Sequence, residues 1–227
     1  MLLNSKRDNK ILEMMGVFNG KTFGNVLAKT LWVNNKNGFQ QSMNRVRKLR
    51  DNFKIFKLVP TGLLNPRNAI ILTQSGKDYC DLELGLYVGE PHLSVVTINH
   101  NMLEQIVWYW LSESGREVTR TTVKSWVTDK RFKHAPDLYF EDENGGVYCE
   151  IETSKKSKER YNEIFVKIRK DGIKKVIYFF ENAKRMEQIG RVIPLWEKVI
   201  FYVDIEEMIK NEGKADFIPQ RQFLANL

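Results

Sequence analysis

The alternation of short β-rich segments with amphipathic helical segments in residues 95–227 is the feature that most constrains the fold. After a first helix, three strands are expected before the next helix begins. The predicted helices are residues 101–111, 157–169, 182–190 and 204–210, and the predicted strands are residues 117–127, 138–140, 147–152, 175–180 and 198–203. This α-β-β-β-α-β-α-β order predicts an α/β domain, in which helices cover both faces of a mixed sheet.

Residues 1–90 show a different pattern, in which helical segments come first and two strands follow. Helices are expected around residues 11–15, 26–31 and 39–53, and strands at residues 54–59 and 69–73. Thr22 is a suitable N-cap for the second helix, and Pro and Gly residues between the strands predict a turn. Three helices and a hairpin form a winged helix-turn-helix. We therefore expect two domains, residues 1–90 and residues 95–227.

Charge is distributed unevenly between these two parts. Residues 1–77 contain 14 Lys and Arg and 3 Asp and Glu, whereas residues 78–227 contain 22 Lys and Arg and 25 Asp and Glu. The whole chain carries a net charge of +8. A positive surface of one sign favours a polyanionic partner. The alternative is a basic surface that serves only solubility.

The third predicted helix carries much of the positive charge. Its apolar residues Phe39, Met43, Val46, Leu49 and Phe53 step by three or four and predict one buried stripe. The other face holds the candidate DNA-binding residues Gln41, Asn44, Arg45, Arg47 and Lys48. Amides and guanidiniums read base edges and phosphates, so this helix is expected to enter the major groove of duplex DNA. The alternative is an interaction module whose basic helix is merely solvated.

Several classes are disfavoured by composition. No apolar run approaches the roughly 18–20 residues of a membrane-spanning helix, and the first ten residues lack the apolar stretch of a secretory signal. Cys80 and Cys149 lie too far apart in the sequence for a metal-binding spacing. We expect a cytoplasmic protein without a membrane partner or a small-molecule cofactor.

Three carboxylates suggest the chemistry of the second domain. Asp137 follows Pro136 at the start of one strand, and Glu150 and Glu152 alternate on the next. Residues i and i+2 of a strand share a face, and paired strands lie about 5 Å apart, so the three side chains are expected to converge. Such a cluster is costly unless a cation neutralises it. Oxygen ligands favour Mg²⁺ or Mn²⁺, which would orient a scissile phosphate and lower the pKa of a bound water. The alternatives are a solvated strand face and an ordinary turn aspartate.

The segments 71–76 (ILTQSG), 98–105 (INHNMLEQ), 134–137 (HAPD) and 150–161 (EIETSKKSKERY) resemble a known family. The pair Pro136-Asp137 followed by Glu150-Ile151-Glu152 looks like the PD-(D/E)XK nuclease motif, and the wider pattern is similar to the replication-relaxation family and the MobC-type plasmid relaxases. That resemblance implies a winged helix followed by a restriction-endonuclease-like domain. It also implies metal-dependent DNA cleavage in plasmid mobilisation or replication, with relaxosome or replication proteins as partners.

One position departs from the general motif, which ends in lysine where this chain has Glu152. The variant with glutamate resembles the relaxase-like members, and Lys155 could reach back to serve as the catalytic cation. Residues 155–175 contain nine Lys and Arg against three acidic residues. Lys156, Lys158 and Arg160 are therefore candidate DNA-binding residues beside the carboxylates.

Three further residues are weaker candidates. Glu104 could supply a fourth carboxylate, His134 could act as a ligand or proton shuttle, and Tyr161 is the first candidate for a tyrosine nucleophile, with water as the alternative. The leading hypothesis is a metal-dependent, site-specific nicking endonuclease. The alternatives are a non-catalytic, sequence-specific DNA-binding protein in replication control or transcription, and a nuclease that cuts duplex DNA.

Overall fold

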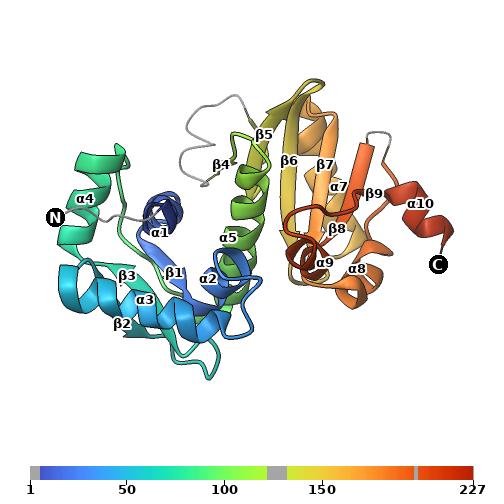
Figure 1. Ribbon diagram of the computed structural model, residues 1–227. Helices are drawn as coiled ribbons and strands as arrows, with labels where there is room; N and C mark the ends of the chain where they lie inside the picture. The colour runs from blue at the N-terminus through green and yellow to red at the C-terminus, as the bar shows by residue number, and fades with distance from the viewer. Residues whose placement is uncertain (1–5, 122–131, 197–198, 227) are drawn as a thin grey trace. The chain divides into compact units, whose positions relative to one another are not determined.

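The computed structural model describes residues 6–121, 132–196 and 199–226 (Figure 1). The chain divides into two compact units, Met1–Tyr109 and Trp110–Leu227, and the division falls inside helix α5 (Ile98–Glu113). The boundary expected near residues 90–95 lies just before this helix. Both units combine helices with a β-sheet, which confirms the α/β class. No helix within the described ranges is long and apolar enough to cross a membrane.

The first unit contains a three-stranded antiparallel sheet with the strand order β1-β3-β2. Its elements are α1 (Lys6–Val17), β1 (Lys21–Phe23), α2 (Gly24–Thr30), α3 (Gly38–Phe53), β2 (Phe56–Pro60), β3 (Asn68–Leu72) and α4 (Gln74–Leu84). The predicted hairpin is confirmed, because β2 and β3 pair from Phe56–Leu72 to Pro60–Asn68.

Strand β1 was not expected, because three residues are too few to show an alternating pattern. Thr22 is paired with Ile70 inside this strand, so its prediction as an N-cap is wrong. The residue that precedes α2 is Phe23, and it makes no side-chain capping hydrogen bond.

The prediction of one buried apolar stripe along α3 is confirmed for the middle of the helix and is wrong for its first turn. Val46 and Leu49 are completely buried in the core of the first unit, and Met43 and Phe53 are half-buried. Phe39 is 52% exposed. It lies in the first turn of α3, where its ring edge reaches Gly24 at the start of α2, so only one side of the ring is covered.

The second unit contains a six-stranded mixed sheet with the order β4-β5-β6-β7-β8-β9. Its strands are β4 (Thr119–Arg120), β5 (Leu138–Asp142), β6 (Gly145–Glu152), β7 (Lys175–Phe180), β8 (Val199–Asp204) and β9 (Ile218–Pro219). Strands β6, β7 and β8 run parallel, and the other pairings are antiparallel. Most of the strand predicted at residues 117–127 lies outside the described residues.

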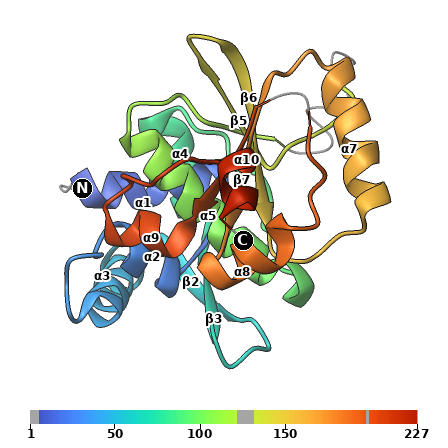
Figure 2. The same cartoon turned by 90° about the vertical axis from the view of Figure 1, so that its right-hand side faces the viewer.

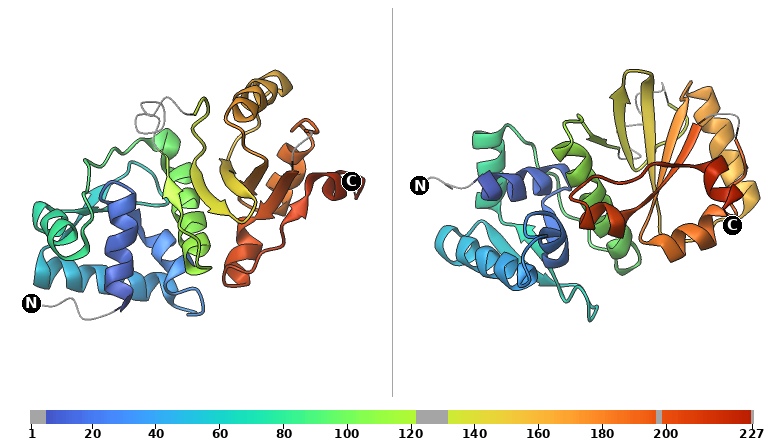
Figure 3. Two further views of the ribbon diagram at one scale, coloured as in Figure 1. Left: turned by 90° about the horizontal axis from the view of Figure 1, so that it is seen from above. Right: turned by 45° about the vertical axis from the view of Figure 1, so that its right-hand side comes forward.

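Helices α7 (Lys158–Lys170) and α8 (Ala183–Gly190) form the crossovers between the parallel strands, and α9 (Ile205–Lys210) and α10 (Gln220–Ala225) follow. Helices α7, α8 and α10 lie on one side of the sheet (Figure 2, Figure 3). Tyr161 of α7, Tyr178 of β7, Tyr202 of β8 and Phe223 of α10 belong to the core on this side. The predicted helices and strands from residue 138 to residue 210 are confirmed within two or three residues at each end. Strand β9 and helix α10 were not predicted, because they are too short to show a periodic pattern.

Candidate functional site

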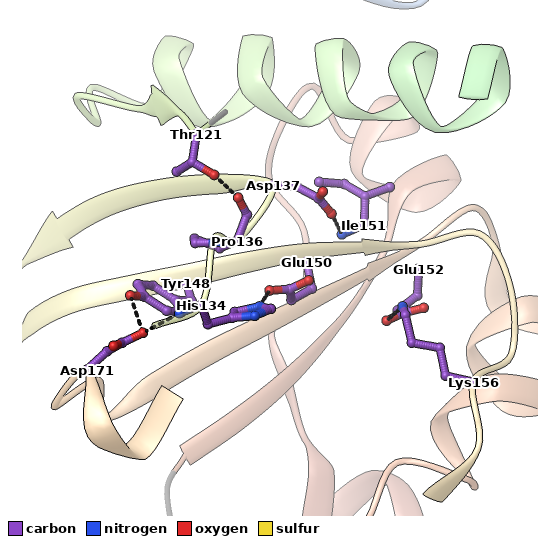
Figure 4. Close-up of polar contacts among 10 residues, drawn as sticks. All are labelled: Thr121, His134, Pro136, Asp137, Tyr148, Glu150, Ile151, Glu152, Lys156 and Asp171. Carbon is purple, nitrogen blue, oxygen red and sulfur yellow. Dashed lines mark hydrogen bonds and ion pairs between the residues drawn. The ribbon is translucent and has the colours of Figure 1, made fainter. Parts of the chain in front are cut away.

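The hairpin of β5 and β6 brings Asp137 next to the C-terminal part of β6. Strands β5 and β6 pair with Leu138 opposite Cys149, which places Asp137 opposite Glu150. The backbone N–H of Asp137 donates to the Cys149 carbonyl at 3.1 Å, and its side-chain Oδ2 accepts from the Ile151 N–H at 2.7 Å (Figure 4). Asp137, which precedes the first residue of β5, therefore extends the pairing of the hairpin, and the backbone of β6 holds its carboxylate.

Glu150 is buried and pairs with a histidine from the loop before β5. His134 Nε2 lies 2.6 Å from Glu150 Oε1, and the two side chains are 14% and 11% exposed. Burial raises the pKa of Glu150 because it disfavours the charged carboxylate. His134 opposes this effect, whereas the charge of Asp137 adds to it.

Glu152 is the most deeply buried of the three acids, at 1% exposure. Its Oε1 accepts a hydrogen bond from Lys156 Nζ (Figure 4). Its Oε2 has no hydrogen-bond partner among the described residues. Burial raises the pKa of Glu152 to about 7 despite Lys156, and the charges of Glu150 and Asp137 raise it further. The three carboxylates are therefore close enough to repel one another.

The carboxylates nevertheless have three different partners: a backbone N–H, His134 and Lys156. Among the residues that the structure describes, no group of three or more His, Cys, Asp or Glu side chains is arranged to hold a metal ion. The donor set consists of oxygens that suit a hard divalent cation, and the unpartnered Glu152 Oε2 is one such oxygen. To share a cation, Glu150 and Glu152 would have to exchange their contacts with His134 and Lys156.

Two consecutive lysines, Lys155 and Lys156, follow β6, and Lys156 is the one that contacts the acidic cluster. Lys155, which was expected to reach back to the site, is exposed and lines a cleft beside α8. Lys156 contacts Glu152 instead, and its Nζ lies 5.7 Å from the centre of the Tyr161 ring. Lys158 and Arg160 are exposed in the first turn of α7, where Arg160 also pairs with Glu163 at 2.8 Å.

Asp171, which was not predicted as a site residue, holds the loop that carries His134. Its carboxylate accepts from the backbone N–H of Lys133 at 2.5 Å. It also accepts from the backbone N–H of His134 at 2.9 Å and from the Tyr148 hydroxyl at 3.1 Å (Figure 4). Asp171 lies 37 residues from His134 in the sequence, at the C-terminal end of α7. The glycine after it, Gly172, indicates a turn, and a turn does not reveal a distant partner.

Two of the weaker candidates are buried. Tyr161 is inaccessible in the core of the second unit, where burial and the charge of Glu152 raise the pKa of its hydroxyl. A buried phenol with a raised pKa is a poor nucleophile. Glu104 is buried in α5, in the unit that comprises residues 1–109.

The candidate DNA-binding residues of α3 differ in what they contact. Gln41, Asn44, Arg47 and Lys48 are exposed. Arg45 instead donates through Nε to Asp8 Oδ1 at 2.7 Å and through Nη2 to Asp8 Oδ2, and the Asp8 side chain is 1% exposed. The guanidinium of Arg45 therefore anchors α3 to α1.

Comparisons with protein-family models, with curated proteins and with solved structures give no significant match for this chain.

Proposed function

We propose that the protein is a DNA-binding, metal-dependent endonuclease that nicks one strand at a specific site, of the relaxase type found in plasmids and other mobile elements. In this proposal the first unit is a winged helix that selects the DNA site, and the second is a restriction-endonuclease-like domain that carries the PD-(D/E)XK motif. Relaxosome or replication proteins would be its partners.

The order of elements supports both assignments. The first unit runs helix, short strand, two helices and a hairpin, which is compatible with a winged helix whose α3 enters the major groove. The chain then runs α5-β4-β5-β6-α7-β7, in which only the end of α5 belongs to the second unit, with antiparallel pairing up to β6 and parallel pairing of β6 with β7. The PD-(D/E)XK fold has the same αβββαβ order. Because one fold can host many functions, the proposal depends on the residues at the hairpin.

The observation that carries the proposal is the placement of Asp137 across the hairpin from Glu150, on the strand that also holds the buried Glu152. Each of the two glutamates has a pKa raised by burial and by its acidic neighbours. Buried acids that lie close together destabilise a fold unless protons or nearby cations neutralise them, and a bound metal ion is one such cation. The three residues also match the spacing of the nuclease motif.

Each residue has a distinct role in this proposal. Asp137, Glu150 and Glu152 would hold Mg²⁺ or Mn²⁺, which when bound stabilises negative charge on the phosphate. The Ile151 N–H fixes one oxygen of Asp137. Lys156, whose side chain is 33% exposed, is placed to neutralise phosphate charge once Glu152 turns to the cation. The buried Tyr161 favours water as the nucleophile.

A plasmid nicking assay tests the proposal. With Mg²⁺ or Mn²⁺, the protein is expected to convert supercoiled plasmid carrying its own locus to open circle. Asp137→Ala and Glu150→Ala should abolish the conversion while DNA binding persists. Glu143→Ala, which removes an exposed carboxylate from the turn of the same hairpin, is the control and should nick normally. Equal nicking by all three variants would refute the assignment of the site.

A second candidate is a non-catalytic, sequence-specific DNA-binding protein. The pairing of Glu150 with His134 and of Glu152 with Lys156 favours it, because these contacts offset the acidic charge without a metal. For this function, the same protein would bind a DNA site with equal affinity with and without Mg²⁺ and would leave supercoiled plasmid intact.

A further inference from the structure

A cleft of about 630 Å³ lies at the start of α8, outside the acidic cluster. Four of its lining residues are cationic, namely Lys155, Lys184, Arg185 and Arg191, and one is acidic, namely Glu187. Glu187 forms an ion pair with Arg191 one helical turn later. The remaining three cations are exposed, and no ion pair to any of them is found within the described ranges. The cleft therefore presents a net positive charge to solvent.

The topology explains why these cations gather. Strands β6 and β7 are parallel neighbours, with Glu152 in register with Phe180. Lys155 lies in the loop after β6, and Lys184 and Arg185 lie in the first turn of the helix after β7. Because parallel strands end at the same edge of a sheet, the two loops lie side by side, and this edge is where open α/β sheets bind ligands.

One loop connects the cleft to the candidate site. Lys155 lines the cleft, and the next residue, Lys156, contacts Glu152. An extended polyanion whose phosphate lay at the acidic cluster would meet Lys155 and then the cations of α8. The lining contains no aromatic side chain among the residues described there, so it offers no platform on which bases could stack.

We propose that this cleft binds the phosphate backbone of the DNA on one side of the nicked position and contributes affinity without reading sequence. The inference rests on the proposed function of the acidic cluster and identifies a second DNA-binding surface, separate from α3. Lys155, Lys184 and Arg185 are its phosphate-binding residues, and Ile189 forms an apolar wall of the cleft.

The test measures how the binding of a random-sequence DNA duplex depends on salt. Each lost phosphate contact lowers the slope of log K against log salt by about 0.9. The double variant with Lys184→Ala and Arg185→Ala should therefore lower the slope by about 1.8 and weaken binding roughly 10-fold or more near 0.1 M salt. The loss should be the same for every duplex sequence. A double variant with Lys210→Ala and Lys214→Ala removes two exposed charges elsewhere in the same unit and should leave the slope unchanged.

The outcomes separate this inference from the proposed function. If the wild-type protein does not bind DNA, both fail. If the wild type binds and loses affinity on replacement of Arg47 and Lys48 in α3, but the α8 variant keeps the wild-type slope, only the cleft is refuted. Equal losses in the α8 variant and its control would also refute it, because net charge alone would then explain the effect. Replacement of both α8 residues by glutamine should reproduce the alanine result.

Discussion

His134 Nε2 lies 2.6 Å from Glu150 Oε1, although 16 positions separate the two residues in the sequence. The pair connects the loop before β5 to the C-terminal part of β6, the strand that carries both glutamates. Asp171 keeps this loop in place through the N–H groups of Lys133 and His134. The conformation of the acidic cluster therefore depends on contacts from three separate segments of the second unit.

Replacement of His134 by alanine should destabilise the protein. Glu150 would lose the partner that opposes the effect of burial on its pKa, so we expect a loss of about 1–3 kcal/mol in the free energy of unfolding at pH 7. Urea unfolding measures the change. His92→Ala, which removes an exposed histidine, should have little effect, and equal stability of the two variants would contradict the role of the pair.

Arg45 and Arg47 should differ in what they contribute, although both are arginines of α3. Arg45→Ala removes two hydrogen bonds from the buried Asp8 carboxylate and should cost about 2–3 kcal/mol of stability. Arg47 is exposed, so Arg47→Ala should change stability by about 0.5 kcal/mol or less while it weakens DNA binding. Urea unfolding and DNA titration of both variants check this, and a larger stability loss for Arg47→Ala would reverse the assignment.

Glu152 should make the metal-free protein less stable as the pH rises. Its pKa is raised to about 7 in the folded state, above the value of about 4.3 in an unfolded chain. Between these two values the folded state keeps a proton that the unfolded state has released, so stability falls with increasing pH and then levels off above pH 7. The contribution is about 4 kcal/mol at most.

The pH dependence of Glu152→Gln isolates this contribution, because glutamine does not titrate. Unfolding measured between about pH 5 and pH 8 should show a smaller decrease in stability for the variant than for the wild type. Glu187→Gln removes an exposed carboxylate and should follow the wild-type curve. A parallel pH dependence of Glu152→Gln and wild type would show that Glu152 titrates at an ordinary pKa.

Tyr161→Phe should retain nicking and lose little stability. The Tyr161 hydroxyl is buried beside the Glu152 carboxylate but forms no hydrogen bond of normal geometry among the described residues, so we expect its removal to cost little stability. Tyr202→Phe is the control, since the Tyr202 hydroxyl donates to the Gly190 carbonyl and accepts from Gln220 Nε2, both at 3.0 Å. That variant should lose about 1–2 kcal/mol. Loss of nicking by Tyr161→Phe would favour a tyrosine nucleophile.

Local patterns in the sequence predicted most of the elements. The continuous apolar run of β7 and the Asn-Gly turn before β6 need no distant partner to be recognised, because burial and turn conformation act on adjacent residues. The i, i+2 spacing on β6 likewise indicated that Glu150 and Glu152 share a face. Strands β1 and β9 were not predicted, because two or three residues are too few to show an alternating pattern of apolar and polar side chains. They are strands only because they pair with β3 and β8.

The tertiary structure decided which groups each charged side chain contacts. The sequence by itself determined that Asp137, Glu150 and Glu152 lie near one another and that a lysine pair follows them. Only the tertiary structure shows that Lys156 contacts Glu152 while Lys155 lines the α8 cleft. It also shows that His134 pairs with Glu150 and that Arg45 pairs with Asp8. The physical reason is that side-chain periodicity follows from local backbone geometry, whereas ion pairs and pKa shifts depend on burial and on charges from segments that are distant in the sequence.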